Sequence, residues 1–243
     1  MTRGQDTPLV QTYARIGGVL GLVSVAAGGF GEAYVPTMVI SANDAAATAT
    51  NIVQNSVLVR LGFASYLLEA LCDVALALIL YALLRPVHRD LALLATFFRL
   101  IGTTGFAVAQ VFHFAALPLA QRPANLAGLS SEQLDALALL SIKTGQYGAT
   151  VFMMFYGMGF LITGWLMLGA NYLPRFVGIL MMMTGAGFVA RTFLWALAPA
   201  YASPLLLLPA AFAGLALGFW LILKGVDVEK WREQVAAGQF RSL

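Results

Sequence analysis

Five charged side chains well inside long apolar stretches of this sequence could carry chemistry: Glu32, Glu69, Asp73, Arg99 and Arg191. A charge in the hydrocarbon of a membrane is costly unless it is paired or hydrated, so it marks a structural or functional site. Such residues fix helix register as ion pairs, carry protons or ions, or bind the polar part of a ligand. These five residues therefore define the chemistry that the chain could perform.

Asp73 and Arg99 are expected to form an ion pair. A short charged turn joins the two apolar stretches that hold them, so the corresponding helices should be antiparallel neighbours. With a rise of about 1.5 Å per residue, the two side chains reach a similar depth. A buried pair mainly compensates its own desolvation, so we interpret this one as a structural ion pair.

Glu32, Glu69 and Arg191 are expected to form a second cluster in the opposite half of the membrane. Glu69 lies four residues before Asp73, so one helix face carries both carboxylates. Because three acids face two arginines, one carboxylate should be protonated, hydrated or in contact with a ligand. Glu32, Glu69 and Arg191 are therefore candidates for a ligand site or an ion pathway.

The stretch that contains Arg99 also carries Thr103, Gln110 and His113 along one narrow helix face. Their offsets from Arg99 are 4, 11 and 14 residues, and at about 100° per residue these positions stay together. This face should point into the bundle, so Gln110 and His113 join the ligand or ion-pathway candidates. The other histidine, His88, lies in a polar turn, so bis-histidine haem ligation is not expected. We expect no metal site and no cofactor, and we assign no catalytic residue.

The elements that must position these residues are membrane-spanning helices. Of the 243 residues, 60% are hydrophobic and 10% are charged, whereas about 25% of the residues of soluble domains are charged. This composition excludes an ordinary soluble enzyme, a disordered chain and a nucleic-acid-binding protein. A spanning helix needs about 20 mostly apolar residues. We predict an all-α integral membrane protein, a bundle of six transmembrane helices in a single domain over residues 1–243, with spans at about 16–39, 58–83, 91–118, 146–168, 176–198 and 205–223.

The distribution of basic residues predicts the orientation. Cytoplasmic loops of membrane proteins are enriched in Lys and Arg. Of the 14 such residues, nine fall on one side of the six spans: Arg3, Arg15, Arg85, Arg89, Arg175, Lys224, Lys230, Arg232 and Arg241. Both termini are therefore expected in the cytoplasm, as an even number of spans requires. The location predicted is the bacterial cytoplasmic (inner) membrane.

The sequence resembles a known family along nearly its whole length. The most specific part runs from Cys72-Asp73-Val-Ala-Leu-Ala-Leu-Ile-Leu-Tyr81 through Arg85-Pro-Val87 to Phe98-Arg99-Leu100, and Leu173-Pro-Arg175 and Gly225-Val-Asp-Val-Glu-Lys-Trp231 add to it. These motifs are similar to a bacterial membrane family called domain of unknown function 4386. The resemblance implies a multi-pass membrane protein of this size and no particular activity.

Three functional classes follow from these features. The first is a binding or accessory protein in the lipid bilayer, whose buried polar cluster faces a lipid-like or quinone-like ligand or a membrane partner subunit. The alternative is a proton-linked small-molecule carrier or channel that uses Glu32 or Glu69 as the titrating group. An intramembrane enzyme ranks last, because the sequence contains no recognisable nucleophile–base pair or set of metal ligands.

Overall fold

The computed structural model describes residues 6–239 and is helical, with no strand among these residues. Six of its helices are long and apolar enough to cross a membrane, which confirms the predicted fold class. Arg3 and Arg241, which enter the orientation argument, lie outside the described residues. The elements are α1 (Asp6–Gly28), η1 (Gly29–Tyr34), α2 (Val35–Val39), α3 (Ala45–Gln54), α4 (Ser56–Leu84), α5 (Arg89–Ala120), η2 (Ala124–Leu126), α6 (Ser131–Gly169), α7 (Arg175–Leu197), η3 (Pro199–Tyr201), η4 (Pro204–Leu207), α8 (Leu208–Leu223) and α9 (Val228–Gln239).

The fourth spanning helix is longer than predicted, because α6 begins at Ser131 rather than near residue 146. Its start is fixed by a reciprocal cap. The Ser130 backbone N–H donates to Gln133 Oε1 at 2.8 Å, and the Gln133 N–H donates to Ser130 Oγ at 3.2 Å. This arrangement satisfies two amide groups that the first helical turn would otherwise leave unpaired. No proline or glycine follows until Gly145, so the helix continues into the apolar stretch.

The first spanning segment is interrupted by the π-helical turn η1, which the sequence did not predict. A π-turn widens the helix and changes its hydrogen-bond pattern, and such turns are common at functional sites. The Tyr66 hydroxyl of α4 donates to the Gly31 carbonyl at 2.7 Å. The tyrosine therefore supplies a side-chain partner to the backbone of the widened turn.

The chain folds into two compact units, each built from segments that are distant in the sequence. Unit 1 comprises residues 1–25, 71–103 and 153–243, and unit 2 comprises residues 26–70 and 104–152. Each unit has its own apolar core. The core of unit 1 is centred on buried residues such as Leu83, Leu166 and Leu221, and that of unit 2 on residues such as Ile52 and Leu117.

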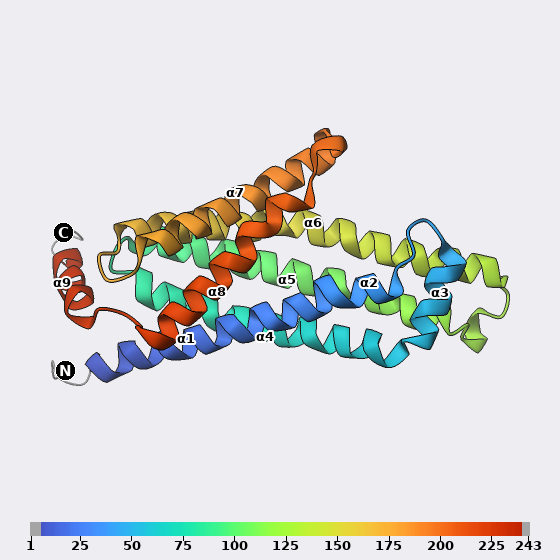
Figure 1. The fold of residues 1–243 in the computed structure, drawn as a ribbon, viewed down its shortest axis with the longest axis horizontal. Coiled ribbons are helices and arrows are strands. Elements are labelled where there is room, and N and C mark those ends of the chain that lie inside the picture. The colour runs from blue at the N-terminus through green and yellow to red at the C-terminus, as the bar shows by residue number, and fades with distance from the viewer. Residues whose placement is uncertain (1–5, 240–243) are drawn as a thin grey trace. The chain divides into compact units, whose positions relative to one another are not determined.

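In unit 1, α7 and α8 lie side by side (Figure 1). The helix α9 is held by Gln234, whose Nε2 donates to the Gly169 carbonyl at 3.2 Å, and by Trp231, which packs against the unit 1 core. The buried hydroxyl of Tyr172 donates to the Leu83 carbonyl at 2.7 Å, and burial raises the pKa of Tyr172. The Gln234 and Trp231 contacts attach the polar C-terminal helix, and the Tyr172 hydrogen bond joins the connection between α6 and α7 to α4.

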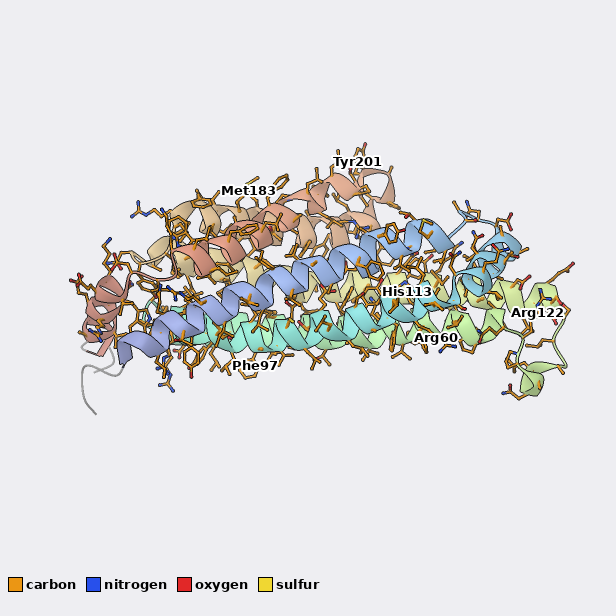
Figure 2. All side chains as sticks on the ribbon, turned by 60° about the horizontal axis from the view of Figure 1, so that its bottom comes forward. Arg60, Phe97, His113, Arg122, Met183 and Tyr201 are labelled. Carbon is orange, nitrogen blue, oxygen red and sulfur yellow. The ribbon has the colours of Figure 1, made fainter. Side chains whose placement is uncertain are left out.

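Large apolar side chains cover much of the outside of the spanning helices. Phe97, Met183 and Tyr201, labelled in Figure 2, are 55%, 52% and 74% exposed. Soluble proteins rarely expose contiguous apolar surface on this scale. Together with the six apolar helices, this surface identifies a multi-pass membrane protein.

Candidate functional site

Four polar residues of unit 1 form a network, which we call the Asp73 network: Ser24, Asp73, Arg99 and Tyr156. Arg99 Nη2 lies 3.1 Å from Asp73 Oδ1, so the ion pair expected from the sequence is present. Asp73 and Arg99 are only 4% and 5% exposed. Ser24 Oγ donates to Asp73 Oδ1 at 3.0 Å, and the Tyr156 hydroxyl donates to Asp73 Oδ2. Both carboxylate oxygens of Asp73 therefore accept hydrogen bonds.

The four members of the Asp73 network come from four different helices: α1, α4, α5 and α6. The Tyr156 hydroxyl also accepts a hydrogen bond from Arg99 Nη2 at 3.0 Å, and the Arg99 guanidinium lies 5.0 Å from the centre of the Tyr156 ring. A close approach of α5 and α6 makes this possible, because a Cβ on Gly102 would come within 2.8 Å of the Tyr156 backbone nitrogen. This geometry would suit a network that holds four helices in register. The structural role of the Asp73–Arg99 ion pair stays a prediction.

Tyr156 and Ser24 were not identified from the sequence. The signal for Tyr156 was present, because a tyrosine within an apolar span needs a partner for its hydroxyl. Ser24 gave no comparable signal, because a serine in an apolar helix usually bonds to its own backbone.

Unit 2 contains Gln110 and His113, the two α5 candidates further along the predicted polar face. Gln110 is 2% exposed, and its Oε1 is buried with no hydrogen-bond partner. His113 Nδ1 is also buried without a partner, and a Cβ on Gly145 would lie 2.8 Å from it. Both groups therefore retain unused hydrogen-bonding capacity.

Glu32 and Glu69 also belong to unit 2. The carboxylate of Glu69 lies against Gly28, since a Cβ there would come within 2.8 Å of Glu69 Oε1. Both carboxylates act electrostatically on the hydroxyl of Tyr66, and Glu32 is exposed on η1. Arg191 belongs to unit 1, where its Nε is buried with no hydrogen-bond partner. The cluster expected between these two glutamates and Arg191 stays a prediction.

A cavity of about 50 Å³ lies within unit 2. Its wall is almost entirely apolar, and the side chains of Tyr66 and His113 provide its polar groups. Figure 2 labels His113 on α5. The cavity is lined by Gly31, Val35, Pro36, Val39, Ile40, Ile52, Val59, Gly62, Phe63, Tyr66, His113, Phe114, Ala116 and Ile142. Of these residues, only His113 was selected from the sequence, because apolar lining residues follow the same pattern as ordinary core residues.

Within residues 6–239, no three His, Cys, Asp or Glu side chains are grouped so that they could hold a metal ion.

Comparison with known proteins gives the family of the chain. No curated protein and no solved structure matches the chain. A family model described as "Domain of unknown function (DUF4386)" matches residues 16–225. The match spans most of the sequence, and the chain therefore belongs to the DUF4386 family.

Proposed function

We propose that this protein binds a lipid-like molecule in the bacterial cytoplasmic membrane, with one acyl chain held in the cavity of unit 2. The observation that carries the proposal is this apolar cavity with a histidine in its wall. Ligand sites are typically apolar hollows with a few polar groups that fix the orientation of the ligand. The cavity of unit 2 has this composition.

The volume of the cavity favours an acyl chain over a quinone ring. A dry cavity of about 150 Å³ accommodates benzene, whereas this cavity measures about 50 Å³. This volume is about a third of the one that accommodates benzene, so it matches a few methylene groups of a flexible chain better than a six-membered ring. Among the ligands considered from the sequence, the lipid-like one is therefore the better match.

His113 is the residue that we assign to the polar part of the ligand. The Tyr66 hydroxyl already donates to the Gly31 carbonyl, whereas His113 Nδ1 has no partner. Nδ1 lies against Gly145, and we assign Nε2 to a hydroxyl or carbonyl group of the ligand. In this proposal, Gly145 positions the imidazole because it has no side chain to displace it.

The location and orientation are part of the same proposal. The basic residues Arg85, Arg89, Arg175 and Lys224 are exposed at the ends of spanning helices of unit 1. Their positions along the chain support cytoplasmic termini under the positive-inside rule. Reporter fusions at both ends test this, and reporters that place the ends in opposite compartments would contradict it.

The ligand is tested by native mass spectrometry of the purified protein and by lipid extraction. Val59 lines the cavity, while Val57, on the same helix, is 69% exposed. Val59→Trp should fill the cavity and remove a co-purifying lipid, and the matched Val57→Trp variant should retain it. Equal retention by both variants, or only bulk lipid in the wild type, would contradict the proposal. A co-purifying membrane protein without a specific lipid would instead support the accessory role.

A second candidate is a proton-linked carrier or channel, which Glu32 in the π-turn and Glu69 near that turn favour. Glu32 and Glu69 both act on Tyr66, and Glu69 lies against the backbone next to that turn. This candidate predicts a pH-dependent flux in proteoliposomes that Glu69→Gln abolishes while the purified protein remains folded. A flux no greater than that of empty vesicles for protons and every solute tested would exclude it.

A further inference from the structure

We infer that unit 1 binds one buried water molecule beside Arg99, and that this water completes the hydrogen bonding of the Asp73 network. The site is a small cavity between α4, α5 and α6, separate from the ligand cavity of unit 2. The cavity, the unused donor of Arg99 and the polar groups in its wall lead to this inference together.

Arg99 has a hydrogen-bond donor that no protein group satisfies. A guanidinium carries five N–H groups in a fixed planar arrangement. Nη2 donates to Asp73 and to the Tyr156 hydroxyl, whereas Nε is buried with no partner. The side chain as a whole is 6% exposed. Because a buried donor without a partner is rare in native proteins, the Nε–H group calls for an acceptor.

Arg99 also lines the cavity where that acceptor would lie. The cavity volume is about 10 Å³, and roughly 10–15 Å³ is the minimum that holds one water molecule. A lipid chain or a larger solute cannot enter so small a space. An anion is not required either, because Asp73 already balances the charge of Arg99.

Two threonines in the cavity wall offer the other contacts that a buried water needs. Thr96 of α5 and Thr163 of α6 both line the cavity. The Thr96 hydroxyl donates to the Ala92 carbonyl at 2.8 Å, so its oxygen still accepts. Buried waters typically make about three hydrogen bonds. The inferred water accepts from Arg99 Nε–H and donates to the hydroxyl oxygens of Thr96 and Thr163.

The test is a crystal structure of the full wild-type chain grown from a lipidic mesophase, at a resolution that shows ordered surface water. The expected result is one solvent peak within hydrogen-bond distance of Arg99 Nε and of at least one of the two threonine hydroxyls. A cavity without density, or one closed by side chains so that Nε contacts only carbon atoms, would overturn the inference. This result leaves the unit 2 proposal unaffected, because the two cavities share no residue.

A pair of alanine substitutions gives a second readout that depends on hydration. Ala77 lines the cavity and is 2% exposed, whereas Ala75 is a half-buried residue of the same helix that does not line it. Ala77→Val should displace the water and leave Nε–H unsatisfied, so its thermal midpoint in detergent should fall below that of Ala75→Val. In a dry cavity, the added methyl groups would remove no hydrogen bond from Arg99. A midpoint for Ala77→Val equal to or above that of Ala75→Val would therefore overturn the inference.

Discussion

The Asp73 network of unit 1 and the cavity of unit 2 place buried polar side chains in different surroundings. In unit 1, Ser24, Asp73, Arg99 and Tyr156 bond mainly to one another. In unit 2, Gln110 Oε1 and His113 Nδ1 are buried without partners, and His113 lines an apolar cavity. A satisfied polar network rigidifies a structure, whereas unused polar groups in a hollow are available to a ligand. On this difference rest our proposals that the Asp73 network positions helices and that unit 2 binds a ligand.

The largest effect should come from removing the cation of the Asp73 network. Arg99→Met leaves the Asp73 carboxylate buried without its counter-charge, and breaking a buried pair from one side costs about 3–5 kcal/mol. The double variant Asp73→Leu/Arg99→Met should be more stable than Arg99→Met, because neither charge remains buried. Reversible unfolding in mixed micelles measures both. A single variant that is as stable as the wild type would show that this ion pair does not hold unit 1 together.

A smaller loss of stability is expected for Tyr156→Phe. This substitution removes one hydroxyl that bonds to both Asp73 and Arg99, and hydrogen bonds to charged groups contribute about 1.5–3 kcal/mol. Tyr13→Phe is the matched control in unit 1, since Tyr13 is 42% exposed and such surface changes stay within about 0.5 kcal/mol. The same unfolding assay compares the two variants, and equal midpoints would contradict the role of Tyr156.

His113→Phe should separate binding from stability. Losing the imidazole removes the polar contact proposed for the ligand, so the retained lipid should fall in native mass spectrometry. The change in unfolding free energy should stay within about 1 kcal/mol, because Nδ1 has no partner to lose. Tyr156→Phe should show the reverse, with reduced stability and normal lipid retention. If both variants lost lipid and stability to the same extent, the contrast between the units would fail.

The smallest effect concerns the attachment of α9 at low pH. Hydrogen bonds from the side chain and the backbone N–H of Lys230 lower the pKa of Asp227. A carboxylate whose pKa is lower in the folded state stabilises that state at pH values above its unfolded pKa, which is about 4 for aspartate. This stabilisation is lost as the pH falls through the folded-state pKa. Amide protection of α9 should therefore decrease below that pH in the wild type, and Asp227→Asn should remove the dependence. An identical pH profile in the variant would contradict the role of Asp227.

The sequence predicted those features of the structure that the hydrocarbon interior of a membrane requires of any chain. Six apolar stretches became six helices of spanning length, because backbone groups in a membrane must bond within their own helix. The contact between Asp73 and Arg99 followed from helix rise and from the cost of an isolated charge. Both inferences depend on large free-energy costs, which only a few arrangements of the chain avoid.

Features that depend on close packing could not be predicted in the same way. The turn η1 contains Gly29 and Gly31 and is preceded by Gly28, and such a glycine-rich sequence fits an ordinary helix contact equally well. The cavity of unit 2 depends on how side chains such as Val59 and Phe114 meet across different helices. In the sequence, helix α3 is recognisable only as an alanine-rich segment. The side chain of its N-cap residue, Asp44, accepts a hydrogen bond from the Ala47 N–H at 2.9 Å. Asp44 could have indicated the start of this helix, but the polar composition of the surrounding loop made the helix hard to recognise.

The most direct measurement is an anomalous difference map from crystals grown with a phospholipid brominated on its acyl chain. If unit 2 binds such a chain, bromine peaks should lie in its cavity between Val59 and Phe114, with the lipid's polar end beside His113. Val59→Trp crystals grown identically should lack those peaks. Bromine found solely along the outer surfaces of the helices, with the unit 2 cavity empty, would contradict lipid binding by this protein.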